Sequence, residues 1–187
     1  MDMDEIKQRV LEDVDPPSRK KKRKRIIRVM IQTLIEFISI IAVIFLAFQF
    51  IWGIGTVDGM SMYPTLHDGD RAVYYRLEKD IAKGDVVVLD RQEDGIFIKR
   101  VAAVAGDTVS IQDGSLYVNG RECVIESAAG KTIVPDSGIE YPLRLGDKEV
   151  FVIGDNRENS EDSRYFGAVK TEEIKGKVLF YFGKIDQ

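Results

Sequence analysis

The stretch IFIKRVAAVAGDTVSIQDGSLYVNG, residues 96–120, decides the fold class. It consists of short runs of β-branched and aromatic residues, and pairs such as Asp113-Gly114 separate these runs. Such pairs favour tight turns, because glycine accepts positive φ and the aspartate side chain bonds its own backbone. The stretch therefore predicts antiparallel strands, with a hairpin at Asp113-Gly114.

Similar runs lie on both sides of this stretch. They are RAVYYRL (71–77), DVVVLDR (85–91), EVFVIGD (149–155) and KVLFYFG (177–183). No long helical periodicity is evident after residue 60. We therefore expect a mostly β domain over residues 57–187, built from many short strands and tight turns.

The region before this domain differs in character. The twenty-one residues from Phe37 to Val57 carry no charged side chain, and seven consecutive basic residues, Arg19 to Arg25, precede them. As a helix, the uncharged stretch would be about as long as one hydrocarbon core. It predicts one N-terminal transmembrane helix, a signal anchor over 29–56. A cleaved signal peptide is the alternative, but the stretch is longer than a usual signal-peptide core and ends in no small-x-small site.

The basic run also predicts the orientation. A cytoplasmic excess of Lys and Arg places residues 1–28 inside as a basic tail and residues 57–187 outside, in a single-pass protein of the cytoplasmic membrane. The phospholipid bilayer is therefore an expected partner. Residues 1–18 are expected to be disordered, and Pro16-Pro17 separates them from the basic run.

Composition excludes several classes of protein. A chain of 187 residues with one cysteine, Cys123, and one histidine, His67, holds no internal disulfide and little for a zinc site of the Cys/His type. Residues 1–28 hold ten basic and six acidic residues, a charge of +4, whereas 58–187 hold seventeen and twenty-four, a charge of −7. This distribution argues against a nucleic-acid partner. We expect no cofactor and no metal.

A candidate nucleophile follows the anchor. In VDGMSMYPTLHDGD (57–70), Ser61 lies between two methionines, and a serine in such a setting is most often only a turn residue. A nucleophilic serine needs a base. His67 is one candidate. Exposed or half-exposed Met60, Met62 and Tyr63 would suit a membrane-bound ligand.

Lys99 is the other candidate base. A period of two puts Phe97, Lys99 and Val101 on one face of a strand, where apolar neighbours would desolvate the ammonium and lower its pKa. The strand alone favours the alternative, an exposed edge strand whose lysine points into water. A third polar segment, GDNRENSEDSRYFG (154–167), contains Asp-x-Arg at 155–157 and again at 162–164. A solvated loop or structural salt bridges would explain it.

Taken together and in order, these segments resemble the bacterial type I signal peptidases. The matching stretches are VDGMSMYPTL (57–66), GDRAVYY (69–75), GDVVVLD (84–90), FIKRVAAVAGD (97–107) and GDNRENSEDSRYFG (154–167), behind a single anchor as in the Gram-positive form. The resemblance implies a membrane-anchored catalytic β domain with a small inserted β subdomain, about 103–149. It also implies a membrane-bound serine endopeptidase that removes signal peptides from exported preproteins at the outer face of the cytoplasmic membrane.

The resemblance also assigns roles to individual residues. Ser61 matches the nucleophile and Lys99 the general base of a Ser–Lys dyad that acts through an acyl-enzyme. The positions that match supporting residues are Ser160, which would orient the lysine, and the ion pairs Arg100–Asp155 and Asp162–Arg164. Substrate contacts are expected at Gly59, Met60 and Met62. Gly59 departs from the Gram-negative pattern, in which a serine adds a hydroxyl to the oxyanion hole.

Expected partners are preprotein signal peptides with small residues at the first and third positions before the cut, and proximity to the protein translocation channel. Three other functions compete. A non-enzymatic anchored β domain would leave the ordered motifs unexplained, and a self-cleaving repressor of the Ser–Lys type would lack the anchor. A sortase-type transpeptidase would use a reactive cysteine, here Cys123, with histidine and arginine.

Overall fold

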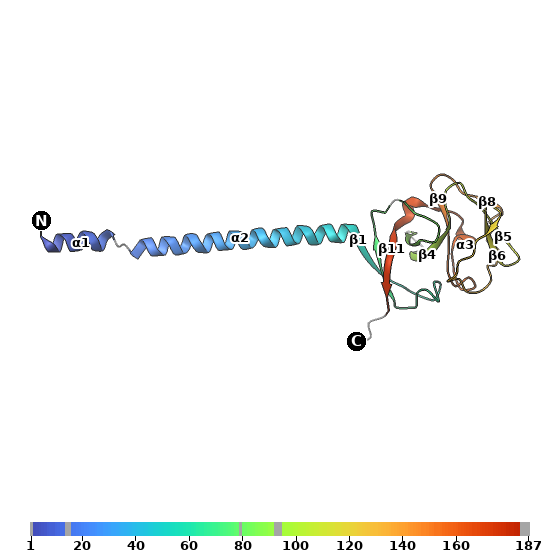
Figure 1. Cartoon of the computed structure of the whole chain (residues 1–187), viewed down its shortest axis with the longest axis horizontal. Helices are drawn as coiled ribbons and strands as arrows, with labels where there is room; N and C mark the ends of the chain where they lie inside the picture. The colour runs from blue at the N-terminus through green and yellow to red at the C-terminus, as the bar shows by residue number, and fades with distance from the viewer. Residues whose placement is uncertain (1, 14–15, 79, 92–94, 184–187) are drawn as a thin grey trace. The chain divides into compact units, whose positions relative to one another are not determined.

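The computed structural model describes residues 2–13, 16–78, 80–91 and 95–183. The chain divides into two compact units, Met1–Phe48 and Gln49–Gln187 (Figure 1). The first unit contains helix α1 (Met3–Asp13) and most of helix α2 (Pro16–Ile51). The expectation of disorder over 1–18 is therefore wrong for the part that the structure describes. The acidic residues Asp4 and Glu5 in the first turn of α1 favour a helix there.

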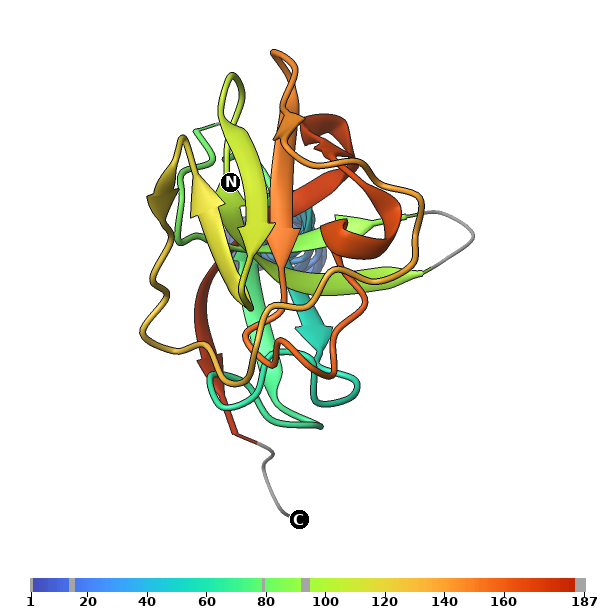
Figure 2. The ribbon, with the colours of Figure 1, turned by 90° about the vertical axis from the view of Figure 1, so that its right-hand side faces the viewer.

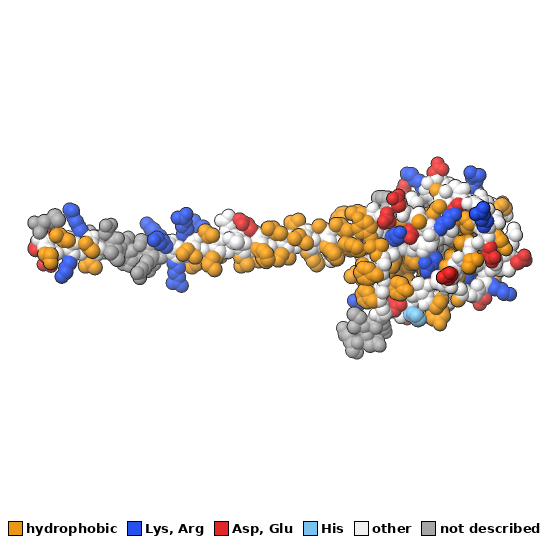
Figure 3. Space-filling model, viewed as in Figure 1, with side chains coloured by type: hydrophobic (Ala, Val, Ile, Leu, Met, Phe, Trp, Pro, Cys, Tyr) orange, Lys and Arg blue, Asp and Glu red, His pale blue; other side chains and the backbone are white. Residues whose placement is uncertain are grey.

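Helix α2 carries the apolar segment. Within it, the 31 residues Lys21–Ile51 contain an 18-residue window with a mean hydropathy of 2.5, so by length and composition this part could cross a membrane once. Figure 3 shows the basic side chains on the early turns of α2 and apolar side chains along the turns that follow. This apolar N-terminal helix is consistent with a single-pass membrane anchor.

The helix ends earlier than the sequence predicts. Trp52–Thr56 is not helical but forms strand β1, which pairs antiparallel with β2 (Arg71–Tyr75). The two glycines of WGIGT permit this pairing, because a Cβ on Gly53 would lie only 2.1 Å from the ring of Tyr74. The expected boundary at 56/57 is thus displaced, and the compact β unit begins at Gln49.

The β unit is built on a seven-stranded antiparallel sheet. Its strand order is β1-β2-β11-β3-β4-β9-β10, so β2 has the first strand of the unit, β1, on one side and the last, β11, on the other. The remaining bounds are β3 Val86–Asp90, β4 Ile96–Ala103, β9 Glu149–Ile153, β10 Val169–Lys170 and β11 Ile174–Phe182, with short helices α3 (Ser163–Phe166) and η2 (Thr171–Glu173). The mostly β fold class predicted from the short runs is confirmed.

A second, four-stranded sheet lies between β4 and β9 in the chain. Its order is β7-β6-β5-β8, with bounds β5 Thr108–Gln112, β6 Ser115–Val118, β7 Arg121–Glu122 and β8 Leu143–Arg144. All four strands fall inside the range expected for the insert, and Asp113-Gly114 joins β5 to β6 with positive φ at both residues. Figure 2 shows the yellow strands of the insert beside the orange strand β9. A shared core of Val109, Leu116, Phe151 and Ile153 joins the two sheets.

Candidate active site

A cleft of about 440 Å³ lies in the β unit. Residues 55–62, from the end of β1 and the turn that follows it, form one part of its lining, and residues 96–99 of β4 form another. Asn159 and Glu161, from the loop that follows β9, also line it. Val88 of β3 completes the lining, so the cleft gathers four segments of the chain, and both Ser61 and Lys99 line it.

The turn that carries Ser61 is fixed by its neighbour. Met62 has no exposed surface and packs with Val57, Leu66 and Ala72. The sequence suggested that Met62 would be exposed or half-exposed, and this is wrong. Met62 is buried and contributes to the inner lining of the cleft. Met60 is 40% exposed and lines the cleft, as does Gly59. Burying one methionine anchors the turn and leaves the Ser61 hydroxyl at the cleft surface.

The backbone around Ser61 is held from two directions. Asn156 donates its backbone N–H to the Ser61 carbonyl at 3.0 Å and its side-chain amide to the Met60 carbonyl at 3.1 Å. Gly59, at φ +82°, donates its N–H to Asp68 at 2.8 Å. The N–H of Ser61 bonds to no residue that the structure describes. It is therefore a free donor beside the Ser61 hydroxyl.

Lys99 Nζ lies 2.7 Å from Ser61 Oγ. Strand β4 is flanked by β3 and β9, so Lys99 is not on an exposed edge, and only 3% of it is accessible. The exposed-edge alternative is therefore wrong. Burial lowers the pKa of Lys99 to about 8, because it penalises the ammonium more than Asp162 and Glu161 stabilise it. Phe97 lies on the same face, with its ring centroid 5.3 Å from Nζ.

Ser160 lies beside this pair but does not bond to it. Its hydroxyl is buried and has no hydrogen-bond partner among the residues that the structure describes, so the expected bond to the Lys99 ammonium is absent. Its position depends on Gly154, where a Cβ would lie 2.2 Å from Ser160 Oγ and 2.5 Å from the Ser61 carbonyl oxygen. A glycine is thus required where the loop approaches Ser61.

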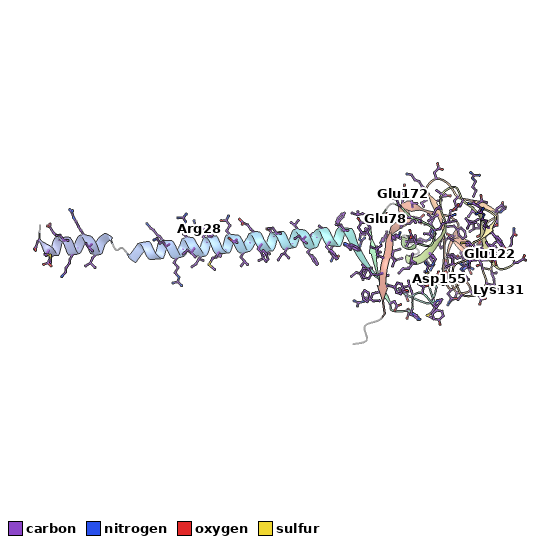
Figure 4. The ribbon with its side chains drawn as sticks, viewed as in Figure 1. Arg28, Glu78, Glu122, Lys131, Asp155 and Glu172 are labelled. Atoms are coloured by element: carbon purple, nitrogen blue, oxygen red, sulfur yellow. The ribbon has the colours of Figure 1, made fainter. Side chains whose placement is uncertain are left out.

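Asp155 and Arg100 form a paired cluster on the opposite face of β4. Arg100 donates from Nε and Nη2 to the Asp155 carboxylate, at 2.8 and 2.7 Å, and Thr65 and Ser127 donate their hydroxyls to the same group. Asp155, labelled in Figure 4, is fully buried. Burial raises its pKa, but these donors, Arg100 foremost, outweigh burial and bring the pKa below its usual value.

Asp162 and Arg164 form a second buried pair. Arg164 donates from Nε and Nη2 to the Asp162 carboxylate at 2.8 and 2.9 Å, and both residues are at most 2% exposed. Asp162 also caps α3 and accepts the N–H of Gly154 at 2.9 Å. The pair therefore fixes the loop after β9 to the end of that strand, beneath Ser160.

The other candidate nucleophile and base lie outside the cleft. His67 has a side chain that is 60% exposed, stands 3.8 Å from Asp70 and contacts the edge of the Tyr63 ring. Cys123 is half-buried in the insert, and burial raises the pKa of its thiol. Neither lines the cleft. Among the described residues, no group of three or more His, Cys, Asp or Glu could hold a metal ion.

Sequence reasoning missed several residues that support Ser61. Asn156 and Gly154 lie in the quoted GDN segment, but their role depends on contacts with Ser61 across 93 or more positions of sequence, which no local pattern reveals. Thr65 and Ser127 join Arg100 and Asp155 from two further segments. For Gly154 and Asn156, a polar run between two apolar strands was the only local signal available.

Comparison with known proteins gives the family. The family model described as signal peptidase, peptidase S26, matches residues 30–182. The chain belongs to the signal peptidase family. It is 38% identical over 146 residues to signal peptidase I S of Bacillus subtilis, covering 72% of this chain and 78% of that protein. It is 34% identical over 175 residues to signal peptidase IB of Staphylococcus aureus, covering 82% and 91%.

A solved structure of a signal peptidase I from Enterococcus faecalis is also similar. It shares 28% sequence identity, covers 55% of this chain and 98% of its own, and has a TM-score of 0.42. Membership of the signal peptidase family makes the chain a serine peptidase, a hydrolase, and confirms the resemblance seen in the ordered segments. The sortase-type, repressor-type and non-enzymatic alternatives are thereby excluded.

Proposed function

We propose that this chain removes signal peptides from exported preproteins with a Ser61–Lys99 dyad, through an acyl-enzyme, at the outer face of the cytoplasmic membrane. Family membership gives the coarser activity, signal peptide removal by a serine peptidase. The observation that carries the finer proposal is the 2.7 Å contact between Lys99 Nζ and Ser61 Oγ at a lysine that is only 3% exposed.

The first half of the reaction forms the acyl-enzyme. A buried lysine with a pKa of about 8 is neutral in an appreciable fraction of molecules near neutral pH, so it can accept the Ser61 proton. Ser61 Oγ then attacks the carbonyl carbon after the last signal-peptide residue. The N–H of Ser61, which bonds to no described residue, would stabilise the oxyanion that forms. The C–N bond breaks, Lys99 returns the proton to the leaving nitrogen, and the mature protein departs.

The second half hydrolyses the ester. Neutral Lys99 takes a proton from a water molecule, and the resulting hydroxide attacks the ester carbonyl. Ser61 leaves as an alkoxide and recovers its proton from Lys99. Arg100–Asp155 and Asp162–Arg164 are positioning pairs that hold β4 and the loop after β9, and the buried Ser160 lies against Gly154 in that loop.

The cleft suits an extended peptide with small side chains. Its lining includes the apolar side chains of Met60, Val88 and Ile98, which would exclude large substrate side chains sterically. The substrates would then be signal peptides with small residues at the first and third positions before the cut. Gly59 and Met60 line the open part of the cleft, and buried Met62 shapes its inner part.

The proposed topology places residues 1–28 in the cytoplasm and the β unit outside. The basic residues that precede the apolar part of α2 support this orientation. Anchoring in the bilayer would confine enzyme and signal peptide to one surface, close to the translocation channel, and so raise their effective concentration. Protease added to intact protoplasts should digest the β unit, whereas full protection would contradict the orientation.

The dyad is tested by cleavage of a preprotein with detergent-solubilised full-length protein. Ser61→Ala should abolish processing at the site that N-terminal sequencing identifies for the wild type, because the reacting oxygen is lost. Cys123→Ala is the matched control and should process normally, since Cys123 lies outside the cleft. Comparable cleavage by Ser61→Ala would contradict the proposal.

A further inference from the structure

The charges of the cleft are not balanced. Of the described residues that line it, three are ionisable: Asp58, Lys99 and Glu161. Lys99 must be neutral to act as the base, so the reactive form of the cleft holds two carboxylates and no cation. The β unit around it is also acidic, with −7 over residues 58–187. A peptide in the cleft therefore meets a negative potential beside its scissile bond.

No hydrogen bond or ion pair with a described residue explains why a carboxylate stands at Glu161. Its side chain is exposed and makes no hydrogen bond or ion pair with any residue that the structure describes, and the same is true of Asp58. Its near neighbour Glu158 differs, because Glu158 accepts the backbone N–H of Lys131 at 3.2 Å and packs against Gly130. Glu158 thus supports the insert, whereas Glu161 faces the cleft.

The position of Glu161 relative to Lys99 indicates which part of the substrate it meets. Lys99 returns its proton to the leaving nitrogen, which is the first atom of the mature protein. Lys99 and the loop after β9, which lines the cleft with it, therefore lie beside the mature part of the preprotein. Glu161 belongs to that loop and acts electrostatically on Lys99, together with Asp162 and against Arg164. Asp162 is itself neutralised by Arg164, so Glu161 is the unpaired carboxylate there.

From this geometry we infer that Glu161, assisted by Asp58, selects among substrates by charge, favouring preproteins with Lys or Arg just after the cut and disfavouring Asp or Glu there. The inference rests on the proposed function and adds a specificity-determining residue to it. Because the carboxylates are exposed, the effect is moderate and is screened by salt.

The test uses the full-length enzyme in detergent and three peptides that differ only at the second position after the cut, which is Lys, Gln or Glu. Wild type should cleave them in the order Lys, Gln, Glu, with kcat/KM for Lys about fivefold above that for Glu at low salt. The ratio should approach one in 1 M NaCl. Glu161→Gln should reduce it to about twofold, and Glu161→Lys should reverse the order.

Glu158→Gln is the matched control, since it removes the same charge from the same loop outside the cleft. It should keep the wild-type ratio, and an equal loss in both variants would overturn the inference in favour of a general charge effect. Equal cleavage of all three peptides by wild type would also overturn it, while leaving the proposed function intact. Absence of cleavage of every peptide would contradict the proposed function and the inference together.

A second readout separates the role of Glu161 from a purely structural one. Glu161 stabilises the Lys99 ammonium, so Glu161→Gln should lower the pKa of Lys99 and move the rise of kcat/KM with the Gln peptide to lower pH. The other charges near Lys99, namely Asp58, Asp162 and Arg164, are unchanged in this variant. An unshifted profile would contradict the placement of Glu161 beside Lys99.

Discussion

Lys99 and Arg100 are consecutive residues on opposite faces of β4, and their surroundings give them opposite chemistry. Lys99 is buried without an ion pair to any described residue, and burial lowers its pKa to about 8. Arg100 bonds to both oxygens of Asp155, which raises the pKa of the guanidinium further. Burial without a carboxylate partner lowers the pKa of a cationic side chain, whereas burial with such a partner keeps the charge and forms a rigid cross-link.

The largest effect should come from replacing Lys99 with arginine, the residue that the opposite face of β4 carries. Lys99→Arg keeps the positive charge, but guanidinium does not deprotonate in the accessible pH range and cannot accept the Ser61 proton. We expect kcat to fall by roughly 10³-fold or more in cleavage of a preprotein by the solubilised enzyme.

Lys83→Arg is the matched control for this change. Lys83 pairs with Asp107 and is 44% exposed, so its substitution should leave kcat within about twofold of wild type. An active Lys99→Arg variant would show that the reaction needs no neutral base on this face of β4, and would contradict the contrast with Arg100.

The paired face should respond in stability. Asp155→Ala leaves Arg100, Thr65 and Ser127 without their acceptor and should cost about 3–5 kcal/mol of unfolding free energy. Urea unfolding followed by fluorescence of the single tryptophan, Trp52, measures it, because Trp52 lies in β1 against Tyr75.

The exposed pair Lys148–Glu172 supplies the control for Asp155. Both side chains are more than three-quarters exposed, and Glu172→Ala should cost less than about 1 kcal/mol. The pKa of Asp155 is lower in the folded state than in the unfolded state. Its contribution to stability is therefore fully present above the unfolded-state pKa and is lost as pH falls through the folded-state pKa. A wild-type advantage over Asp155→Asn that did not shrink in acid would contradict this assignment.

A smaller effect tests what lowers the pKa of Lys99. Phe97→Ala admits water to the ammonium, which raises the pKa of Lys99, although the loss of the ring face opposes this by about 0.5–1 kcal/mol. We expect the rise of kcat/KM to move up by roughly one pH unit, because desolvation is the larger effect. Leu179→Ala, on β11 away from the cleft, should not move it. A profile that stays in place would mean that Phe97 does not shield Lys99.

The smallest expected effect is at His67. His67→Ala should change kcat/KM by less than about twofold and leave its pH dependence unaltered, because the ring is exposed and lies outside the cleft. A large loss of kcat/KM in His67→Ala would indicate that His67, and not Lys99, is the base.

The sequence predicts the strands well because their signal is local. Alternating residues and Gly-Asp turns lie next to one another in the chain, so 108–120 is readable as a hairpin. Strand β1 is not readable in this way: Trp52–Thr56 continues an apolar helix, and only pairing with β2 and the ring of Tyr74 over Gly53 makes it a strand.

The site is less readable for the same reason. The ordered motifs indicated Ser61 and Lys99 through a family resemblance, but the strand alone favoured an exposed lysine. The pairing of β9 with β4 makes β4 internal, and that contact joins residues about 50 positions apart. The inward turn of Met62 and the unbonded hydroxyl of Ser160 depend likewise on packing that no local pattern encodes.

The pH dependence of kcat/KM for wild-type enzyme tests the central claim most directly, since it reports the pKa of the base in the free enzyme. If Lys99 is the base, activity rises with a midpoint near pH 8 and reaches a plateau before the ordinary lysine pKa. The same midpoint should appear in His67→Ala. A midpoint near 6.5 that disappears in His67→Ala, with Lys99→Arg still active, would contradict the account.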